Sequence, residues 1–258
     1  MTISIQNAVA RLTEARSTSH SISPFSATDE DFTVEHAWAI QDALCSEMAR
    51  RGKAPIGWKL AATGPTGQAV LGVTEPTYGF LLADTYVSPA SVSRSRFVEM
   101  GVEAEIAFKI GKALTGPGVT ATTAFEAVES IMPALELPDL IFSGTPKIAD
   151  FIASSMLPKG IVLGNEFKSL KGLDLANEKI VFAHNGEIVG TNMGHDVMGN
   201  PLNALAWLAN QLGARGYMLK PGDIVMSGGI SKLLRANVGD TIHAEFRQLG
   251  SVSMKVVA

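Results

Sequence analysis

Two helical patterns open the chain. Apolar residues recur at helical spacing at Ile5, Val9 and Leu12. A second pattern runs from about Thr33 to Arg51. Its predicted inner face consists of Val34, Trp38, Cys45 and Met48. Together these patterns predict an N-terminal helical layer.

Beyond Gly52 the pattern changes to short apolar runs separated by glycine and proline, which is typical of strands and turns. The predicted strands are residues 56–61, 80–87, 102–110, 134–137, 160–163, 179–183, 188–191, 223–227, 241–246 and 251–257. Asn185-Gly186 predicts a hairpin, because both residues tolerate the positive φ of a type I′ turn. Two further helices are predicted. They cover residues 123–132, opened by Thr123 and Glu126, and residues 201–214, opened by Asn200-Pro201.

Composition narrows the possible partners and location. The 21 basic residues are scattered and the net charge is -4, so nucleic acid is not an expected partner. The N-terminus lacks the apolar run of a signal peptide, and no window approaches the roughly 20 apolar residues that span a bilayer. The single cysteine, Cys45, fits a reducing compartment. We expect a cytoplasmic protein without a membrane partner, and the mean hydropathy of +0.19 suggests surfaces buried between subunits.

Three glutamates are the candidate metal ligands. Alternation places Glu103 and Glu105 on one face of a strand, although the same spacing also suits a solvated outer face. Glu136 lies in an apolar strand bounded by prolines, where a charge is costly unless it is paired. Three convergent carboxylates form a hard oxygen site suited to Mg²⁺ or Mn²⁺. Lys59 lies among apolar residues and is either part of this site or a surface lysine on an edge strand.

These residues occur within a larger set of motifs. The segments are Gly57-Trp58-Lys59-Leu60-Ala61, Glu103-Ala104-Glu105-Ile106-Ala107-Phe108, Ala134-Leu135-Glu136, and residues 200–210, 220–228 and 249–252. In combination they resemble the 2-keto-4-pentenoate hydratase and 4-oxalocrotonate decarboxylase family, from about Ile40 to the C-terminus. The resemblance implies an α+β fold, a mixed β-roll of the fumarylacetoacetate-hydrolase-like type with an N-terminal helical layer. It also implies a divalent metal held by the three glutamates. We divide the chain into an N-terminal helical region with the first strand, residues 1–75, and a catalytic domain, residues 76–258.

The resemblance implies a small 2-oxo acid substrate from the catabolism of aromatic compounds. Such an acid offers its carboxylate and adjacent carbonyl oxygen to one metal ion. Lys59 would neutralise the anionic substrate and shuttle protons. Ser227, Leu60 and Asp150 are predicted to bind the substrate. A homo-oligomer is expected, alone or together with a decarboxylase or hydratase of the same pathway.

Two departures from the family affect the predicted reaction. Thr77 stands where many hydratases carry an aspartate, and the segment after Asp150 differs from the usual pattern. Hydration of a 2-hydroxy-2,4-dienoate ranks first, followed by decarboxylation of a 2-oxo-hexenedioate, carbon-carbon hydrolysis, and a non-catalytic partner subunit. Apolar residues near the second departure favour an uncharged substrate end, whereas Lys147 and Lys159 leave room for a diacid.

Overall fold

The computed structural model describes residues 3–86 and 91–258 of the chain. The α-helices are α1 (Ile5–Thr18), α2 (Val34–Arg50), α3 (Pro65–Leu71), α4 (Ala121–Ala127), α5 (Ile148–Ala153) and α6 (Pro201–Ala214). Single 3₁₀ turns are η1 (Phe25–Ala27), η2 (Ala83–Thr85), η3 (Arg94–Arg96) and η4 (Gly194–Asp196). The strands of the first sheet are β1 (Pro55–Ala61), β2 (Thr77–Leu82), β4 (Gly101–Ile110), β5 (Val128–Pro138), β6 (Pro158–Leu163), β9 (Ile224–Met226) and β10 (Leu234–Arg235). The strands of the second sheet are β3 (Val92–Ser93), β7 (Lys179–His184), β8 (Glu187–Met193), β11 (Thr241–Phe246) and β12 (Gly250–Val257).

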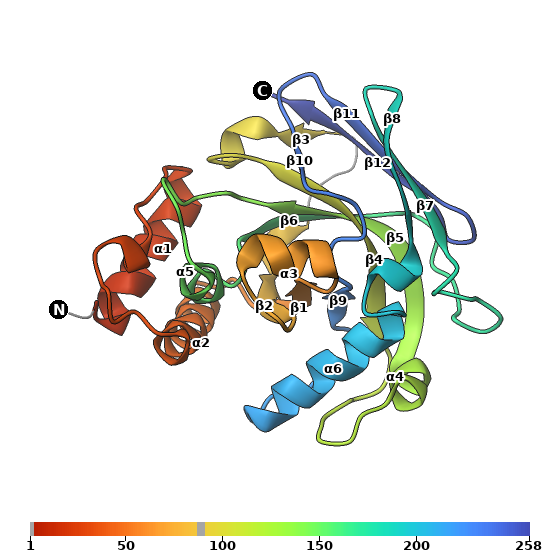
Figure 1. Cartoon of the computed structure of the whole chain (residues 1–258), viewed down its shortest axis with the longest axis horizontal. Coiled ribbons are helices and arrows are strands. Elements are labelled where there is room, and N and C mark those ends of the chain that lie inside the picture. Colours follow the sequence, from red (N-terminus) through yellow and green to blue (C-terminus); the bar gives the residue numbers. More distant parts are fainter. Residues whose placement is uncertain (1–2, 87–90) are drawn as a thin grey trace.

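The first sheet curls into a roll. Its strand order is β2-β1-β9-β4-β5-β6, with β10 paired to β4, and the β1 and β9 pair is parallel. A bridge between Tyr86 and Ile161 brings the chain just after β2 next to β6, so the two ends of the sheet approach each other. The second sheet, β3-β12-β11-β7-β8, packs against its outside (Figure 1). The predicted α+β fold with a mixed β-roll is confirmed.

Two apolar clusters lie on opposite faces of the curled sheet. The larger one fills the space between the sheets and includes Ile106, Phe108 and Leu135. The smaller one lies on the face inside the roll. It consists of Leu81, Ala107, Met132, Ala134, Ile161, Ile224 and Met226. Because Glu105 pairs with Ala134 across β4 and β5, the glutamates belong to this inner face.

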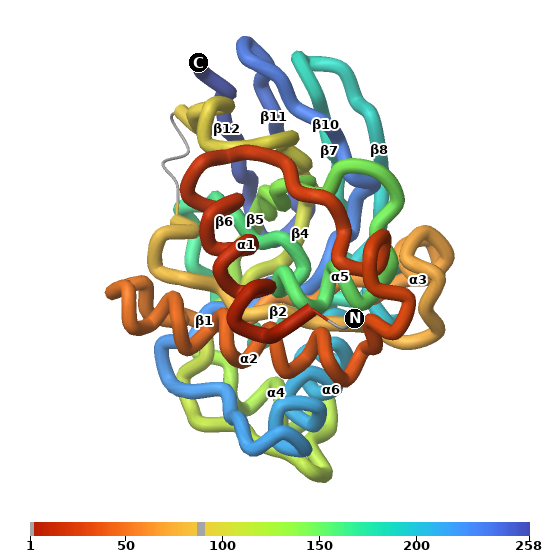
Figure 2. Tube along the Cα trace, turned by 90° about the vertical axis from the view of Figure 1, so that its left-hand side faces the viewer, coloured from red at the N-terminus to blue at the C-terminus, as the bar shows by residue number. Residues whose placement is uncertain are grey.

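The N-terminal layer consists of α1, α2 and α5, which pack together beside the roll (Figures 1 and 2). Helix α2 begins after its N-cap, Thr33, as predicted, but its buried face is rotated relative to the prediction. The buried positions are Ala37, Ile40, Gln41, Leu44 and Met48, whereas Val34 is 37% exposed. The predicted inner face of α2 was chosen from its large apolar side chains. In the structure α1 and α5 pack closely against α2, which favours a face with small residues such as Ala37.

The prediction of a helix over residues 123–132 is wrong in its second half. Thr120, rather than Thr123, caps α4, and the chain turns extended at Val128. Residues 128–132 pair with β4, and Ile131 also forms a bridge with Lys168; these pairings outweigh local helical periodicity. The helix over residues 201–214 and the hairpin are confirmed, since Asn185 and Gly186 adopt φ values of 52° and 87°.

The remaining strand predictions agree with the structure to within a few residues, with two exceptions. Strand β5 is longer than predicted, and the strand predicted over residues 80–87 begins earlier and ends at Leu82, where the turn η2 follows. Val87, the last residue of one predicted strand, lies outside the described residues. The predicted domain division at residue 75 separates β1 from β2 and β9, with which it pairs in one sheet. The division stays a prediction. In residues 3–86 and 91–258, no helix has the length and apolarity needed to cross a membrane.

Candidate metal centre

Two adjacent strands bring the three glutamates together. Glu103 and Glu136 face each other across the β4 and β5 ladder, and Glu105 lies two residues further along β4. Because side chains alternate along a strand, all three lie on the same face. One carboxylate oxygen from each lies within 4.8 Å of the others. Glu105 and Glu136 are fully buried, so the reading of a solvated strand face does not hold.

Lys59 reaches this cluster from β1. Its Nζ lies 2.9 Å from Oε2 of Glu136 and donates a second hydrogen bond to the carbonyl oxygen of Met156 at 3.2 Å. Only 3% of Lys59 is exposed, which rules out the surface-lysine reading. Its neighbour across the sheet is Met226 of β9, so β9 separates the lysine from the β4 glutamates.

Burial and mutual repulsion shape the acidity of the cluster. Burial, together with the charge of Glu136, raises the pKa of Glu103 to about 7, and Lys59 partly opposes this. The same causes raise the pKa of Glu105 well above its usual value. For Lys59, burial lowers the pKa, but the charges of Glu136, Glu105 and Glu103 outweigh it and the pKa is raised. Without a further cation, the cluster therefore favours bound protons.

The residues fit a divalent cation. Oε2 of Glu105 accepts a hydrogen bond from the Gly228 amide at 2.8 Å, whereas Oε1 of Glu105 and Oε1 of Glu136 are buried and have no hydrogen-bond partner among the described residues. Buried carboxylate oxygens without a partner are costly, and a metal ion would satisfy them. Because every candidate ligand is a carboxylate oxygen, the set suits Mg²⁺ or Mn²⁺.

A glycine turn brings backbone close to the cluster. Gly228 has a φ of +94°, and a Cβ at this position would lie 2.4 Å from Oγ1 of Thr63. The positive φ requires glycine at Gly228, whereas a Cβ at Gly229 would lie 2.4 Å from Oε1 of Glu103 and would displace this carboxylate. Ser227 precedes the turn and is fully buried. Its hydroxyl accepts a hydrogen bond from the Ile106 amide at 3.1 Å, and this contact holds the turn against β4. Substrate binding by Ser227 stays a prediction.

The other two predicted substrate residues have contacts elsewhere. Leu60 follows Lys59 in β1, so its side chain points to the opposite face, into the larger apolar cluster. The Asp150 carboxylate accepts hydrogen bonds from the amide and hydroxyl of Ser26 and from the Lys147 amide, which caps α5. These contacts give both residues structural roles and do not support the predicted substrate contacts.

The sequence analysis missed the segment that orients Lys59. Ser155, Met156 and Leu157 all have positive φ, at 61°, 58° and 63°, although none is glycine. The Ser155 hydroxyl accepts a hydrogen bond from the Phe80 amide at 2.7 Å and fixes this left-handed segment against β2. The segment presents the Met156 carbonyl oxygen to Lys59. Left-handed residues of this kind are strained and concentrate at functional sites, but no residue type signals them in the sequence.

Two threonine hydroxyls near the cluster are buried without a partner among the described residues. In the β1 and β2 ladder, Lys59 pairs with Gly79 and Ala61 pairs with Thr77. Because Ala61 is two residues from Lys59 in β1, Thr77 lies on the same face of the sheet as Lys59. Thr63 contacts the Gly228 turn. The sequence marked Thr77 as a departure from the family, whereas nothing marked Thr63. Both hydroxyls are free to bind a water molecule or a substrate oxygen.

Comparisons with known proteins agree with this geometry. The chain is 32% identical to 2-hydroxyhexa-2,4-dienoate hydratase of Comamonas testosteroni, covering 95% of this chain and 94% of that protein. It is 31% identical to 4-oxalocrotonate decarboxylase of Pseudomonas putida, covering 88% and 87% respectively. The structure of 4-oxalocrotonate decarboxylase from Pseudomonas putida G7, solved with magnesium and adipate, superimposes with a TM-score of 0.94 at 27% identity, covering 98% of this chain and 97% of that one. Residues 67–257 match the family described as fumarylacetoacetate (FAA) hydrolase C-terminal. The chain therefore belongs to the fumarylacetoacetate hydrolase family.

Proposed function

We propose that the protein is a Mg²⁺- or Mn²⁺-dependent hydratase that converts a 2-hydroxy-2,4-dienoate to a 4-hydroxy-2-oxo acid in the catabolism of aromatic compounds. The observation that carries the proposal is the buried cluster of three glutamates with Lys59. The similarity to a hydratase over 95% of the chain supports the choice of reaction.

In this proposal Glu103, Glu105 and Glu136 hold the metal ion. When bound, the ion supplies positive charge that binds the carboxylate and C2 oxygen of the substrate and stabilises negative charge developing there. Three carboxylates and a divalent cation sum to -1, so a further positive charge is needed beside an anionic substrate. Lys59 provides this charge, and its raised pKa keeps it protonated at neutral pH.

The protein must also move a proton and position water. Lys59 is held by Glu136 and the Met156 carbonyl, so its ammonium group has a defined direction from which to donate a proton to the substrate. The unpartnered hydroxyl of Thr77, on the same face, is our candidate for positioning the water that adds to the substrate. In this role Thr77 replaces the aspartate found in many hydratases.

The far end of the substrate decides between hydration and decarboxylation, because both reactions begin from a 2-oxo acid bound at the metal. Lys159, one candidate partner for a second carboxylate, is directed elsewhere. Its Nζ donates a hydrogen bond to the Arg16 carbonyl oxygen and lies 4.0 Å from Asp139. This arrangement favours an uncharged substrate end. The alternative is a decarboxylase, which the TM-score of 0.94 to 4-oxalocrotonate decarboxylase favours.

The test supplies 2-hydroxypenta-2,4-dienoate and a 2-oxo-hexenedioate, each with Mg²⁺, and follows loss of the dienol absorbance and release of CO₂. We expect hydration of the dienoate, abolished by a chelator and restored by Mg²⁺. Release of CO₂ from the diacid without hydration of the dienoate would establish the decarboxylase instead. Inactivity on both substrates would reject both reactions.

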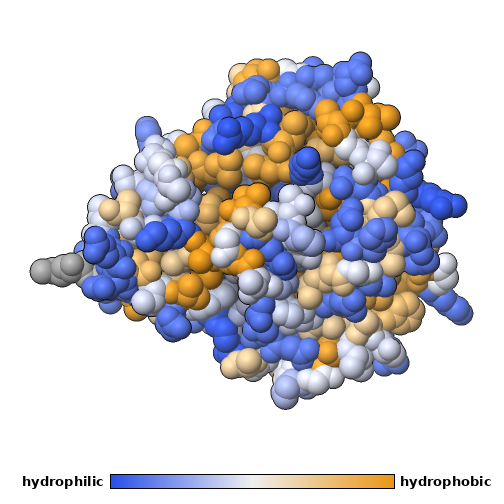
Figure 3. Space-filling model, viewed as in Figure 1, coloured by the Kyte–Doolittle hydropathy of each residue, from blue (hydrophilic) through white to orange (hydrophobic). Residues whose placement is uncertain are grey.

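A homo-oligomer and a cytoplasmic location are part of the proposal. Exposed apolar residues include Val70 of α3, at 80% exposure, and Ile188 and Val189 of the edge strand β8. Figure 3 shows apolar surface gathering in a band across one face of the molecule. Such surfaces are candidates for contacts between subunits. Sedimentation of the purified protein as a monomer at micromolar concentration would contradict the oligomer.

A further inference from the structure

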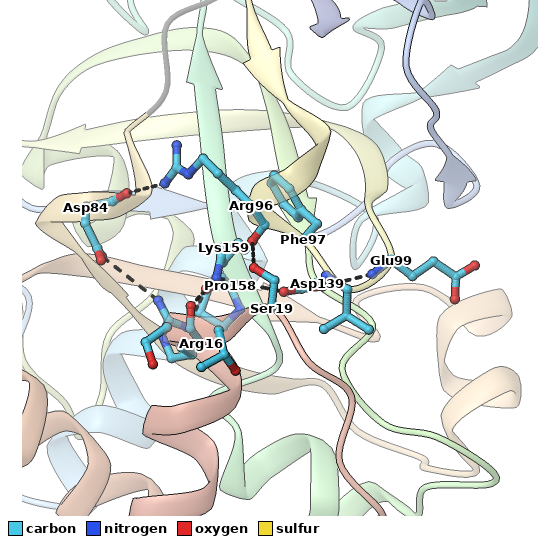
Figure 4. A network of polar contacts seen from close by, with 12 residues as sticks. Arg16, Ser19, Asp84, Arg96, Phe97, Glu99, Asp139, Pro158 and Lys159 are labelled. Atoms are coloured by element: carbon cyan, nitrogen blue, oxygen red, sulfur yellow. Dashed lines mark hydrogen bonds and ion pairs between the residues drawn. The ribbon is translucent and has the colours of Figure 1, made fainter. Parts of the chain in front are cut away.

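A second cluster of charged side chains surrounds a cavity of about 300 Å³ outside the candidate metal centre. Four cations line it: Arg16 of α1, Lys53 before β1, Arg96 of η3 and Lys159 of β6. The only carboxylate among its described lining residues is Asp84 of η2. Figure 4 shows Arg16, Asp84, Arg96 and Lys159 converging from four separate elements. None of these residues belongs to the metal centre, so this cluster is independent of the proposed function.

Hydrogen bonds between distant segments build the walls of this cavity. Nη1 of Arg16 donates to the Pro158 carbonyl oxygen at 2.6 Å, and Lys159 donates to the Arg16 carbonyl oxygen. Nη2 of Arg96 donates to the Asp84 carbonyl oxygen at 3.3 Å. These contacts hold the cations near one another in spite of their repulsion, so the arrangement is fixed by the fold.

The cavity carries a surplus of positive charge. Apart from Asp84, which lines the cavity, the carboxylate of Asp139 lies 4.0 Å from Nζ of Lys159. Four cations therefore face two carboxylates. Burial lowers the pKa of Lys159 to about 8, and repulsion from Arg16 and Arg96 contributes to the lowering while Asp139 opposes it. A bound anion would relieve this repulsion, and guanidinium groups in particular match the oxygens of phosphate.

Asp84 offsets part of this positive charge. Its Oδ2 lies 2.8 Å from Nζ of Lys53. Its Oδ1 is buried, lies 4.0 Å from Nη2 of Arg16 and has no hydrogen-bond donor among the described residues. Because Oδ1 is closed off from solvent and Oδ2 is paired with Lys53, the cations rather than this carboxylate are the groups that meet an anion in the cavity.

We infer that this cavity is a binding site for inorganic phosphate. The four cations neutralise the phosphate charge and donate hydrogen bonds to its oxygens. The volume of about 300 Å³ leaves room for phosphate and several water molecules, since one water occupies about 30 Å³ of the liquid. Bound phosphate would link α1 to η3 and β6, and so connect the N-terminal layer to the roll.

The test titrates phosphate and, separately, sulfate into the full-length, Mg²⁺-saturated protein at pH 7 and fixed ionic strength, by calorimetry. We expect phosphate to bind, and sulfate to bind at the same site, because both anions present oxygens to the same cations. Arg96→Gln should weaken phosphate binding by roughly tenfold or more, because it removes a charged donor from an exposed side chain. The matched control is Arg247→Gln, the same charge change on an exposed arginine outside the cavity, and it should leave the affinity unchanged.

Asp84→Asn tests the charge balance of the cavity. It removes a negative charge beside the cations, so the affinity for phosphate should rise. Absence of phosphate binding, or unchanged affinity in Arg96→Gln, would overturn the inference. If Asp84→Asn fails to fold, the comparison of Arg96→Gln with Arg247→Gln still decides the question.

Discussion

Replacing Lys59 by methionine separates its electrostatic role from its proposed catalytic role. The substitution keeps an unbranched side chain but removes the charge that lies 2.9 Å from the fully buried carboxylate of Glu136. Removing one partner of a buried ion pair typically costs about 3–5 kcal/mol, because the other charge is left uncompensated. We therefore expect metal-free Lys59→Met to lose about this much free energy of unfolding. Saturating Mg²⁺ should recover part of the loss, because the ion supplies positive charge to the same carboxylates.

Turnover and metal affinity should respond differently to this substitution. Losing general acid-base assistance should lower kcat by about 10²–10⁴-fold. The affinity for Mg²⁺ should stay within about tenfold of the wild type or increase, because a neighbouring positive charge is removed.

The assay combines urea unfolding with and without Mg²⁺, calorimetric titration of Mg²⁺, and steady-state kinetics. Lys109→Met is the matched control, since Lys109 lies on the same strand face as Glu103 and Glu105 but pairs with the exposed Glu129 at 2.7 Å. An exposed pair of this kind contributes about 0–1 kcal/mol. Equal stability losses in the two variants, together with unchanged turnover in Lys59→Met, would refute the role of Lys59.

Four further predictions follow from the same site. Glu105→Gln should weaken Mg²⁺ binding by more than about 100-fold without unfolding the protein. Even the loss of a residue that only hydrogen-bonds to a metal ligand lowers metal affinity by about 10–100-fold. Equal affinity by calorimetry would remove Glu105 from the ligand set. Mg²⁺ affinity should rise with pH through about 7, because burial raises the pKa of Glu103 to about 7 and metal binding must displace its proton. A flat profile between pH 5.5 and 7.5 would contradict this. Over the interval from about 4.5 to about 7 the metal-free protein should lose stability with rising pH, since the folded state holds a proton that the unfolded state has released. Thr77→Val should leave the free energy of unfolding unchanged or raise it, because the buried hydroxyl has no partner, while lowering kcat/KM; full activity would exclude Thr77 from positioning water.

The sequence predicted most of the strands, and it selected three glutamates that the fold brings together, for a physical reason. Alternation in β4 places Glu103 and Glu105 on one face, and carboxylates flanked by apolar residues are stable there only near a cation. Glu136 was suggested by its apolar, proline-bounded segment. The register that sets Glu103 opposite Glu136 depends on the pairing of β4 with β5, which no local pattern specifies.

The features that were missed depend on long-range contacts. The start of β5 reads as helix over residues 128–132, and only its pairing with β4 and a bridge from Ile131 to Lys168 make it a strand. The left-handed segment from Ser155 to Leu157 is held by Phe80, a residue 75 positions away. Asp150 resembled a substrate residue through its place in a family motif, whereas its contacts with Ser26 could be known only from the fold.

The most direct test of the account is a crystal structure of the protein grown with excess Mg²⁺. We predict one ion bound by a carboxylate oxygen from each of Glu103, Glu105 and Glu136, at ligand distances of about 2.0–2.1 Å. Lys59 should remain hydrogen-bonded to Glu136 or to the Met156 carbonyl oxygen beside the ion. Carboxylates that diverge into solvent, or an ion bound elsewhere while these three glutamates stay protonated, would contradict the central claim.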